Sequence, residues 1–472
     1  MKDLNIHKQA TTKGIVTSKQ RSYGEIVDWL DKNWNTNTND TNLSCVTQLD
    51  KALDNLSDKV DTILVSGTNG KSITAHFTTK LLQEEGLQVG TFYAPHILTY
   101  NERFTHNNES IANKLFTEIG NEVLNTVELL NITPNSYDVL TIMALLYFHK
   151  VNVDVAVMEV SEATPTNATN ICKPKVVAIT RITDDADAAQ ADAATIANMV
   201  SIVKKDCFVV SGDQSKLNLQ EIERIAHEKG ATWAMPIRKL ATLPYPFEQL
   251  HGRCAALAER AAYIYVNSFA NKDALVLNNS LLAKQKGQRG RPTLEAKRQS
   301  ELNPKRTLEQ FWKDASSTLP GRFQLLDKEK PTLLLDNASN LDAFKNVLLG
   351  IRLLHYQRPL KGLTIVLGCN QEDLDTSELL KLLRYFFKKT SGQVVICPVN
   401  TIPGQKGNTT WDVEKVTNDI KSMKIKAKAA HNFKEAFEWA EKSVDERYGL
   451  VVITGSPSII SEYWKYKGMK KL

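Results

Sequence analysis

Long apolar runs are absent from this sequence of 472 residues, in which no stretch of 18 or more apolar residues occurs. A helix that crosses a membrane needs about 20 such residues. The first 22 residues also lack the apolar core of a secretion signal. We therefore expect a soluble, cytoplasmic protein. The basic, Ser/Thr-rich start gives an organelle transit peptide only weak support, because it contains Asp3 and has no arginine before Arg21.

Paired cysteines and an excess of charge are missing as well. The six cysteines form no C-x-x-C pair, which argues against a zinc site or a disulfide framework and favours reduced thiols inside a cell. The formal net charge is only +6, and the tract 284–306 accounts for most of it. Such a balance gives little support to a nucleic-acid partner.

Short apolar runs instead alternate with helical periodicity along the chain. The runs include "TILVS", "VDVAVMEV", "KVVAIT", "LTIVLG" and "LVVITG". Strand-forming runs without strict polar alternation, separated by helices, indicate parallel strands that are covered on both faces. The predicted class is α/β, with a doubly wound parallel sheet domain followed by a smaller Rossmann-like domain.

A polar, basic tract divides these strands into two groups. It reads "AKQKGQRGRPTLEAKRQSELNPKR" and almost lacks large apolar side chains, which is typical of an exposed linker or insertion. The alternative is a polyanion-binding tract that depends on Arg289 and Arg291. The predicted divisions are an N-terminal domain over 1–283, a linker or insertion over 284–312, and a C-terminal domain over 313–472.

The turn "SGTNGKS" carries the clearest local sign of nucleotide chemistry. Gly67 lacks a side chain, so the backbone there can approach a ligand closely. Lys71 and Ser72 open a helix whose unpaired N–H groups favour an anion. Lys71 would neutralise the β- and γ-phosphates, and the Ser72 hydroxyl would coordinate Mg²⁺. The residues assigned to this phosphate loop are Gly67, Thr68, Asn69, Gly70, Lys71 and Ser72.

The loop departs from the full G-x-x-x-x-G-K-[ST] pattern, since Val65 stands where the first glycine belongs. A plain strand-turn-helix with a coincidental G-K-S is the alternative. Glu159 supplies a second clue because it ends the apolar strand "VDVAVMEV". In an open parallel sheet, ligands bind beyond the carboxyl ends of the strands, so Glu159 can reach a metal beside Ser72. The alternative for Glu159 is a strand-end residue that faces solvent.

Several motifs together resemble those of one enzyme family. "ILVSGTNGKS", "YAPHILTYNERF", "LPGRFQLL" and "LLLDNASN" are similar, in order and spacing, to motifs of folylpolyglutamate synthetases and dihydrofolate synthases, relatives of the bacterial Mur ligases. The resemblance extends from about Tyr23 to Trp464. It implies an amide ligase that uses ATP and Mg²⁺. ATP would phosphorylate a carboxylate of a folate- or pteroate-type acceptor, and glutamate would attack the acyl phosphate. The expected state is a monomer.

The resemblance also implies roles for single residues. Lys71 matches the phosphate-binding lysine, and Ser72 and Glu159 match the Mg²⁺ ligands. Arg322 resembles the arginine that reaches ATP across the cleft, and Asp336 resembles the acid of the D-G-A-H-N motif. The implied catalytic residues are Lys71, Glu159 and Arg322. In isolation, Arg322 and Asp336 could each be a strand-end charge or part of a surface ion pair.

The stretch "APHILTYNERF" resembles the loop that closes near the phosphate loop and the pterin pocket of that family. Without this context His96 would be a surface or core histidine. The residues that match the family pattern here are Pro95, His96, Tyr100, Glu102 and Arg103. Of these, Pro95, His96, Tyr100 and Arg103 are the expected substrate contacts.

Other family motifs are altered. The glycine-rich stretch that ends in D-A-T-N reads "EVSEATPTNATN", and the D-H histidine is missing, since no histidine lies between His149 and His227. Its replacement would have to come from an acid, and the nearest are Asp184, Asp185 and Asp187. Met199 stands at or near the place of the metal-holding lysine, with Lys204 close by but out of register.

Two further positions differ. The H-Q-x-x-N of the linker helix corresponds roughly to "CAALA", and the A-H-N histidine becomes Ser339. One explanation is an active, diverged ligase that works with a single metal. The other is a degenerate homologue that binds nucleotide weakly or serves as a non-catalytic partner. A P-loop kinase or GTPase would need a Walker-B acid and base-specificity elements that the sequence does not show.

Overall fold

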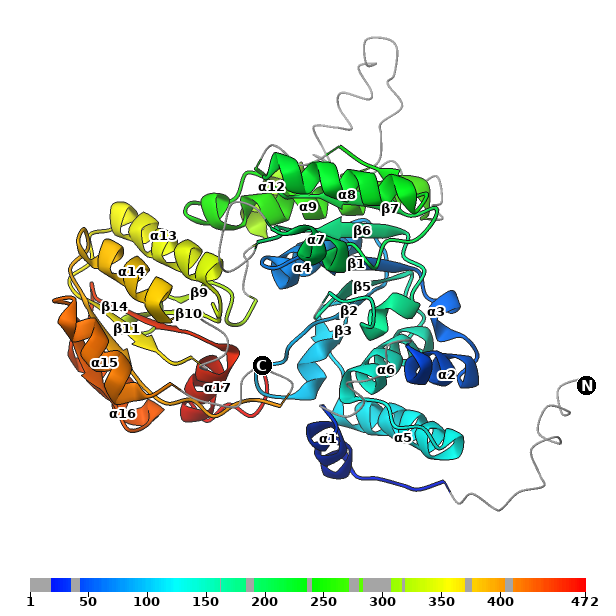
Figure 1. Cartoon of the computed structure of the whole chain (residues 1–472), viewed down its shortest axis with the longest axis horizontal. Coiled ribbons are helices and arrows are strands. Elements are labelled where there is room, and N and C mark those ends of the chain that lie inside the picture. Colours follow the sequence, from blue (N-terminus) through cyan, green and yellow to red (C-terminus); the bar gives the residue numbers. More distant parts are fainter. Residues whose placement is uncertain are drawn as a thin grey trace, which may run out of the picture.

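The computed structural model describes residues 18–34, 43–161, 163–183, 191–235, 240–270, 280–282, 307–315, 319–369, 376–403 and 411–472. Two β-sheets with covering helices make up the molecule, one formed by the N-terminal and one by the C-terminal part of the chain (Figure 1). The α/β class is confirmed.

The N-terminal sheet has the order β4-β3-β2-β5-β1-β6-β7-β8. Its pairings are parallel, except that β3 runs antiparallel to both β2 and β4 at one edge. The strands are β1 (Thr62–Ser66), β2 (Val89–Phe92), β3 (Phe104–His106), β4 (Glu109–Ser110), β5 (Val155–Glu159), β6 (Val176–Ile179), β7 (Phe208–Ser211) and β8 (Thr232–Trp233).

Helices cover this sheet on both sides, which is why its strands read as continuous apolar runs. In β1, Ile63 and Val65 pack in one buried cluster with α4 and α9, whereas Leu64 packs in the opposite cluster with α5 and α6. The helices of this part are α1 (Tyr23–Lys32), α2 (Ser44–Ala52), α3 (Leu56–Lys59), α4 (Lys71–Glu84), α5 (Asn113–Leu130), α6 (Ser136–Lys150), α7 (Ala193–Met199), α8 (Lys216–Glu228) and α9 (Phe247–Ser268), with short 3₁₀ turns at Tyr100–Arg103 and Ala168–Ile171.

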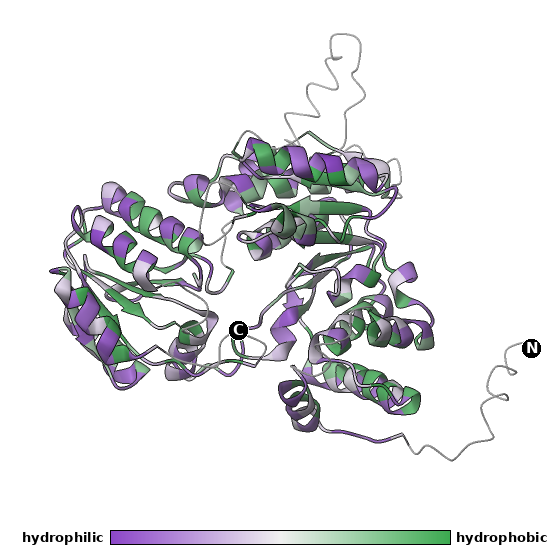
Figure 2. Ribbon diagram, viewed as in Figure 1, coloured by the Kyte–Doolittle hydropathy of each residue, from purple (hydrophilic) through white to green (hydrophobic). Residues whose placement is uncertain are grey.

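The C-terminal sheet has the order β13-β12-β11-β14-β10-β9, parallel except for β9. Its strands are β9 (Gln324–Leu326), β10 (Thr332–Asp336), β11 (Leu363–Leu367), β12 (Gln393–Ile396), β13 (Lys426–Ala429) and β14 (Leu450–Thr454). The helices are α13 (Leu341–Gln357), α14 (Thr376–Phe387), α15 (Val413–Ser422), α16 (Phe433–Lys442) and α17 (Pro457–Tyr466). Buried side chains from α13 to α15 meet one face, and those from α16 and α17 meet the other. Figure 2 shows mostly hydrophobic strands and helices of mixed polarity.

The predicted linker differs from the structure at its end. Residues 308–312 lie in α12 (Leu308–Asp314), where Phe311 and Trp312 are buried against α4 and α9 in the N-terminal core. A pair of large aromatic side chains gives this helix an apolar face, so it packs instead of remaining exposed. Tract 284–306, with Arg289 and Arg291, lies outside the described residues.

Within the described ranges, no helix combines the length and apolar character that crossing a membrane requires.

Candidate active site

A cavity of about 1450 Å³ lies between the two sheets and is lined by residues of both parts of the chain. One set of lining residues, here called the P-loop end, comprises Gly67 to Ser72, Glu159, Arg322 and Asp336. A second set of lining residues, here called the α6 end, comprises Asp31, Trp34, Pro95, Arg103, Asn135 and Tyr137. It adjoins Glu159, whose carboxylate accepts the N–H of Ala94 (3.3 Å) and whose carbonyl oxygen accepts the Tyr137 hydroxyl (3.3 Å). The cavity is thus lined by residues of both parts of the chain, the arrangement that the family resemblance implies.

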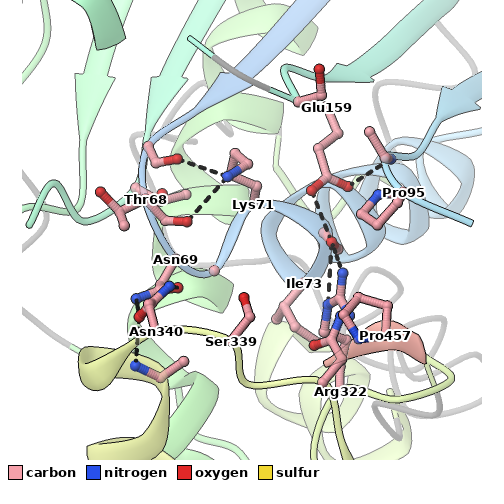
Figure 3. Close-up of a pocket in the computed structure, with 18 of the residues that line it drawn as sticks. Thr68, Asn69, Lys71, Ile73, Pro95, Glu159, Arg322, Ser339, Asn340 and Pro457 are labelled. Atoms are coloured by element: carbon pink, nitrogen blue, oxygen red, sulfur yellow. Dashed lines mark hydrogen bonds between the residues drawn. The ribbon is translucent and has the colours of Figure 1, made fainter. Parts of the chain in front are cut away.

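The phosphate loop joins β1 to α4 and depends on its two glycines. Gly67 has φ +131°, and a Cβ there would lie 2.0 Å from Oγ1 of Thr180; Gly70 has φ +87° and lies against Cys254. Both φ values lie in the region that favours glycine. Lys71 Nζ donates hydrogen bonds to the carbonyl oxygens of Gly67 (2.8 Å) and Thr68 (3.1 Å) (Figure 3). The ammonium group therefore sits inside the loop that it would share with a phosphate.

Ser72 connects the acid of one sheet to the arginine of the other. Its hydroxyl donates to Glu159 Oε1 (2.9 Å) and accepts from Arg322 (2.8 Å), as the dashed lines in Figure 3 show. Burial raises the pKa of the Glu159 carboxyl, while the Lys71 ammonium and the Arg322 guanidinium oppose that rise. The structure thus brings the three predicted catalytic residues to one place.

Hydroxyl and carboxylate oxygens are the protein ligands that suit Mg²⁺, which keeps several waters and binds phosphates in addition. Ser72 Oγ and Glu159 Oε1 meet this description, and they lie within 2.9 Å of each other at the end of β5. Among the described residues, no group of three His, Cys, Asp or Glu side chains forms a metal-binding cluster. The hydroxyl of Ser72 and the carboxylate of Glu159 fit a Mg²⁺ ion by their chemistry and closeness.

Asp336 ends β10 and holds the turn that carries Arg322. Its carboxylate accepts hydrogen bonds from the backbone N–H groups of Phe323 (2.7 Å) and Ala338 (2.9 Å). Burial raises its pKa to about 6, although these hydrogen bonds and Arg322 act in the opposite direction. Asp336 also lines the cavity.

The loop over Ala94–Phe104 divides its predicted substrate residues into two groups. Pro95 and Arg103 line the cavity. His96 and Tyr100 are not among the residues that line it; they are buried, and their rings pack together with centroids 4.2 Å apart. Glu102 accepts backbone N–H bonds from three residues of the loop, so it holds the loop in shape.

Sequence reasoning missed a set of polar contacts that join the phosphate loop to α13. Asn69 and Asn340 exchange two side-chain hydrogen bonds (3.0 and 2.9 Å), and Asn69 also donates to Asp342 (2.9 Å). Arg181 forms an ion pair with Asp342 at 3.0 Å. The available signal was weak: Asn340 caps α13 and Asp342 lies in its first turn, which any capped helix could show. Here the helix start is tied to the opposite sheet.

The altered motifs can also be placed. Met199 and Ser339 line the cavity, and the Met199 carbonyl accepts a hydrogen bond from the Ser66 hydroxyl (2.8 Å). Lys204 is not among the lining residues; its ammonium lies 3.4 Å from Oδ1 of Asn170. Cys254, from the "CAALA" stretch, packs against Gly70. The candidate acids Asp184, Asp185 and Asp187 lie outside the described residues.

The proteins that this chain resembles, by sequence and by structure, are folylpolyglutamate and dihydrofolate synthases. The chain is 31% identical over 214 residues to a dihydrofolate synthase/folylpolyglutamate synthase of Bacillus subtilis, a match that covers 43% of this chain and 46% of that protein. The folylpolyglutamate synthase of Mycobacterium tuberculosis, solved with ADP, superimposes with a TM-score of 0.75 at 20% identity and covers 95% of this chain and 99% of its own. The resemblance to this family is confirmed.

A third similar structure is the bifunctional folylpolyglutamate synthase/dihydrofolate synthase with Mn, AMPPNP and L-glutamate bound. It has a TM-score of 0.70 at 19% identity and covers 96% of this chain and 100% of its own. No family model matches the chain. The matched segment spans about half of the length of the Bacillus synthase. The fold shared with these synthases extends over nearly the whole chain, whereas the sequence similarity is more local.

Proposed function

We propose that this protein is an ATP-dependent ligase that adds glutamate to a folate- or dihydropteroate-type acceptor through an acyl phosphate. The observation that carries the proposal is the group formed by Lys71, Ser72, Glu159 and Arg322, which is assembled from both sheets at one end of the cavity. The similar synthases solved with ADP, or with AMPPNP, Mn and L-glutamate, support it.

The proposed chemistry uses charges that are already in position. A phosphoryl group in transfer requires positive charge around it rather than an elaborate nucleophile. Lys71 would bind the β- and γ-phosphates with the backbone N–H groups at the start of α4, and Arg322 would reach them from the other sheet. Mg²⁺, held by Ser72 and Glu159, would supply further compensation of the phosphate charge. On binding Mg²⁺, the Ser72 hydroxyl would give up its hydrogen bonds with Glu159 and Arg322.

The acceptor would lie at the α6 end, with Pro95 and Arg103 as contacts. His96 and Tyr100 would then act behind the cavity wall and support Arg103. The contacts of Asn69 with Asn340 and of Arg322 with Ser72 hold the two sheets together around the cavity. A closed cavity would keep water away from the acyl phosphate, which hydrolysis would otherwise destroy.

Turnover of ATP tests the proposal directly. The purified protein is incubated with ATP, Mg²⁺, glutamate and a panel of pteroates and folates, and ADP and the glutamylated product are measured. We expect ADP that depends on both the acceptor and glutamate. ADP with no member of the panel would contradict the ligase and would favour the degenerate, nucleotide-binding homologue. We further propose a monomer that acts in the cytoplasm, which light scattering and cell fractionation would test.

A further inference from the structure

Ile97 belongs to the N-terminal part of the chain but is buried in the core of the C-terminal part. It lies in the loop over residues 94–104, is 8% exposed, and packs in the apolar cluster that β10, α16 and α17 share. Apart from its neighbour Leu98, the described members of this cluster all come from residues 326–472. A side chain that the sequence does not single out therefore anchors the cavity loop in the opposite core.

The turn that carries Arg322 is the place where this side chain inserts. Gly321 has φ +66°, and a Cβ built on it would lie 3.3 Å from Cδ1 of Ile97 and 3.3 Å from Cγ2 of Ile460. At a glycine the contact is with the backbone itself, so a shift of the Ile97 methyl group would move the turn. On its other side, the Gly321 carbonyl accepts the N–H of Asn337 (2.9 Å), just after β10. The turn is thus held between its own sheet and the loop of the other sheet.

The same loop also contacts the acid that shares Ser72 with Arg322. The backbone N–H of Ala94 donates to Oε2 of Glu159 (3.3 Å). The other oxygen of that carboxylate accepts the Ser72 hydroxyl, to which Arg322 donates (2.8 Å) (Figure 3). Residues 94–97 therefore bridge the two partners of Ser72, with the acid at one end and the turn of the arginine at the other.

The backbone of the loop is fixed at the point where the Ile97 side chain leaves it. The carboxylate of Glu102 accepts the N–H groups of residues 97, 98 and 99 at 2.8, 3.0 and 2.8 Å. Three hydrogen bonds to one carboxylate set the direction in which Ile97 projects. Close-packed apolar groups transmit a displacement to their neighbours, so the position of the loop is passed on to Gly321.

We propose that Ile97 is a positioning residue for Arg322, because its terminal methyl group holds the turn that directs the guanidinium at Ser72 and the phosphate site. The use of Arg322 in phosphoryl transfer rests on the proposed function, whereas its placement by Ile97 does not. A misplacement of about 1 Å in a group that stabilises a transition state costs about 100-fold in rate. A side chain that touches neither nucleotide nor acceptor can therefore control the reaction.

Calorimetry of AMPPNP–Mg²⁺ binding to four proteins tests this role: the wild type, Ile97→Ala, Arg322→Met and the double variant. We expect Ile97→Ala to weaken binding about 10-fold when Arg322 is present, and less than about twofold when Arg322 is already replaced. A side chain that acts through the guanidinium has nothing to position once that group is gone. An equal loss in both backgrounds, or no loss in either, would overturn the inference.

Two conservative variants separate positioning from general packing. Ile97→Val deletes only Cδ1, the atom that lies against Gly321, while Ile97→Met keeps a chain long enough to reach it. We expect Ile97→Val to weaken AMPPNP binding and Ile97→Met to bind it as the wild type does. The reverse order would overturn the inference, because it would tie the loss to the branched shape of the side chain and not to its reach.

Leu98→Ala is the matched control. Leu98 lies in the same loop and packs against the same cluster, but it is not among the side chains nearest to Gly321. Its truncation should lower the Tm and change AMPPNP affinity less than about twofold. A loss of affinity equal to that of Ile97→Ala would show that any weakening of this interface has the same effect, which would overturn the specific role of Ile97.

Turnover separates this inference from the proposed function. If the wild type is a ligase, Ile97→Ala should lower kcat for ADP formation about 10-fold. A wild type that binds AMPPNP but forms no ADP with any acceptor would overturn the proposed function, and the comparison of affinities would still decide the role of Ile97. A wild type that does not bind AMPPNP would overturn both.

Discussion

The two ends of the cavity balance their charges in different ways. At the P-loop end, Lys71 is held by loop carbonyls, and Ser72 joins Glu159 to Arg322. At the α6 end, the guanidinium of Arg103 is buried against rings and a neutral imidazole and has no carboxylate partner among the described residues. At the first end opposite charges lie close together, whereas Glu102 and Glu159 act on the Arg103 charge of the second end without a direct ion pair among the described residues.

This difference separates two kinds of evidence for function. A group of charged and polar side chains that bind one another can be retained for folding as well as for catalysis. Its presence alone therefore does not establish turnover. A buried charge without a direct ion pair costs stability, so the Arg103 charge by itself does not add to the stability of the fold. The predictions below test whether the P-loop end is more than a structural ion cluster.

Lys71→Ala should have the largest effect. Removing the ammonium takes away the positive charge nearest to the loop carbonyls of Gly67 and Thr68, and ADP formation should fall by about 100- to 1000-fold. Steady-state assays of ADP release measure this loss, and circular dichroism checks that the fold is kept. Lys216→Ala, at an exposed position on α8, serves as the control and should retain activity. Unchanged nucleotide binding by Lys71→Ala would contradict the assigned role.

Glu159→Gln should weaken the metal site while keeping the shape of the side chain. The amide can still accept the hydrogen bond from Ser72, but it lacks the charge that a divalent cation requires. The Mg²⁺ concentration for half-maximal activity should rise by about 10- to 100-fold. A Mg²⁺ titration of ADP formation gives the answer, and an unchanged titration curve would show that Glu159 belongs only to the internal ion cluster.

The P-loop end could be predicted because its signals are local. Gly67 to Ser72 are consecutive, and Glu159 and Asp336 each end an apolar strand, so the rules for parallel sheets bring them to one edge. The doubly wound class followed from the same apolar runs. Arg322 depended on the family resemblance, since nothing in "PGRF" by itself directs an arginine to the opposite sheet.

The α6 end could not be predicted in the same way. His96 and Arg103 lie seven residues apart in sequence, and only the folded loop decides that one lines the cavity while the other supports it. The surroundings of Arg103 depend on several elements, since Trp34, His96 and Tyr100 contact its guanidinium group. The contact of Asp342 with Arg181 likewise joins residues 161 positions apart, which no local pattern contains.

The Arg181–Asp342 ion pair offers a smaller, sharper test of how far the P-loop end depends on the second sheet. Arg181→Met and Asp342→Asn should each weaken AMPPNP–Mg²⁺ binding, because both loosen the attachment of Asn69 to α13. The double variant should be little worse than either single one. We expect a coupling free energy of about 1 kcal/mol from calorimetry. Fully additive effects would show that the pair does not act on the phosphate loop as a unit.

Asp336→Asn should act through the pH dependence of stability. In the folded protein the pKa of Asp336 is about 6, raised from 3.8 chiefly by burial. A carboxyl whose pKa is raised on folding stabilises the fold when protonated. This contribution is therefore complete below about pH 4 and is lost as the pH rises through 6. The free energy of unfolding of Asp336→Asn, taken relative to that of the wild type, should therefore increase by about 1–2 kcal/mol between pH 4 and pH 7.

Unfolding experiments on both proteins at pH 4, 5, 6 and 7 measure this gain. Comparing the two proteins cancels the titration of groups that they share, so the difference reports Asp336 alone. A difference that stays constant with pH would mean that Arg322 and the backbone N–H groups of Phe323 and Ala338 already hold the carboxylate charged. In that case the charge of Asp336 would be compensated within the protein, like the other charges of the P-loop end. A rising difference would instead show that the free protein keeps the charge of Asp336 at a cost in stability.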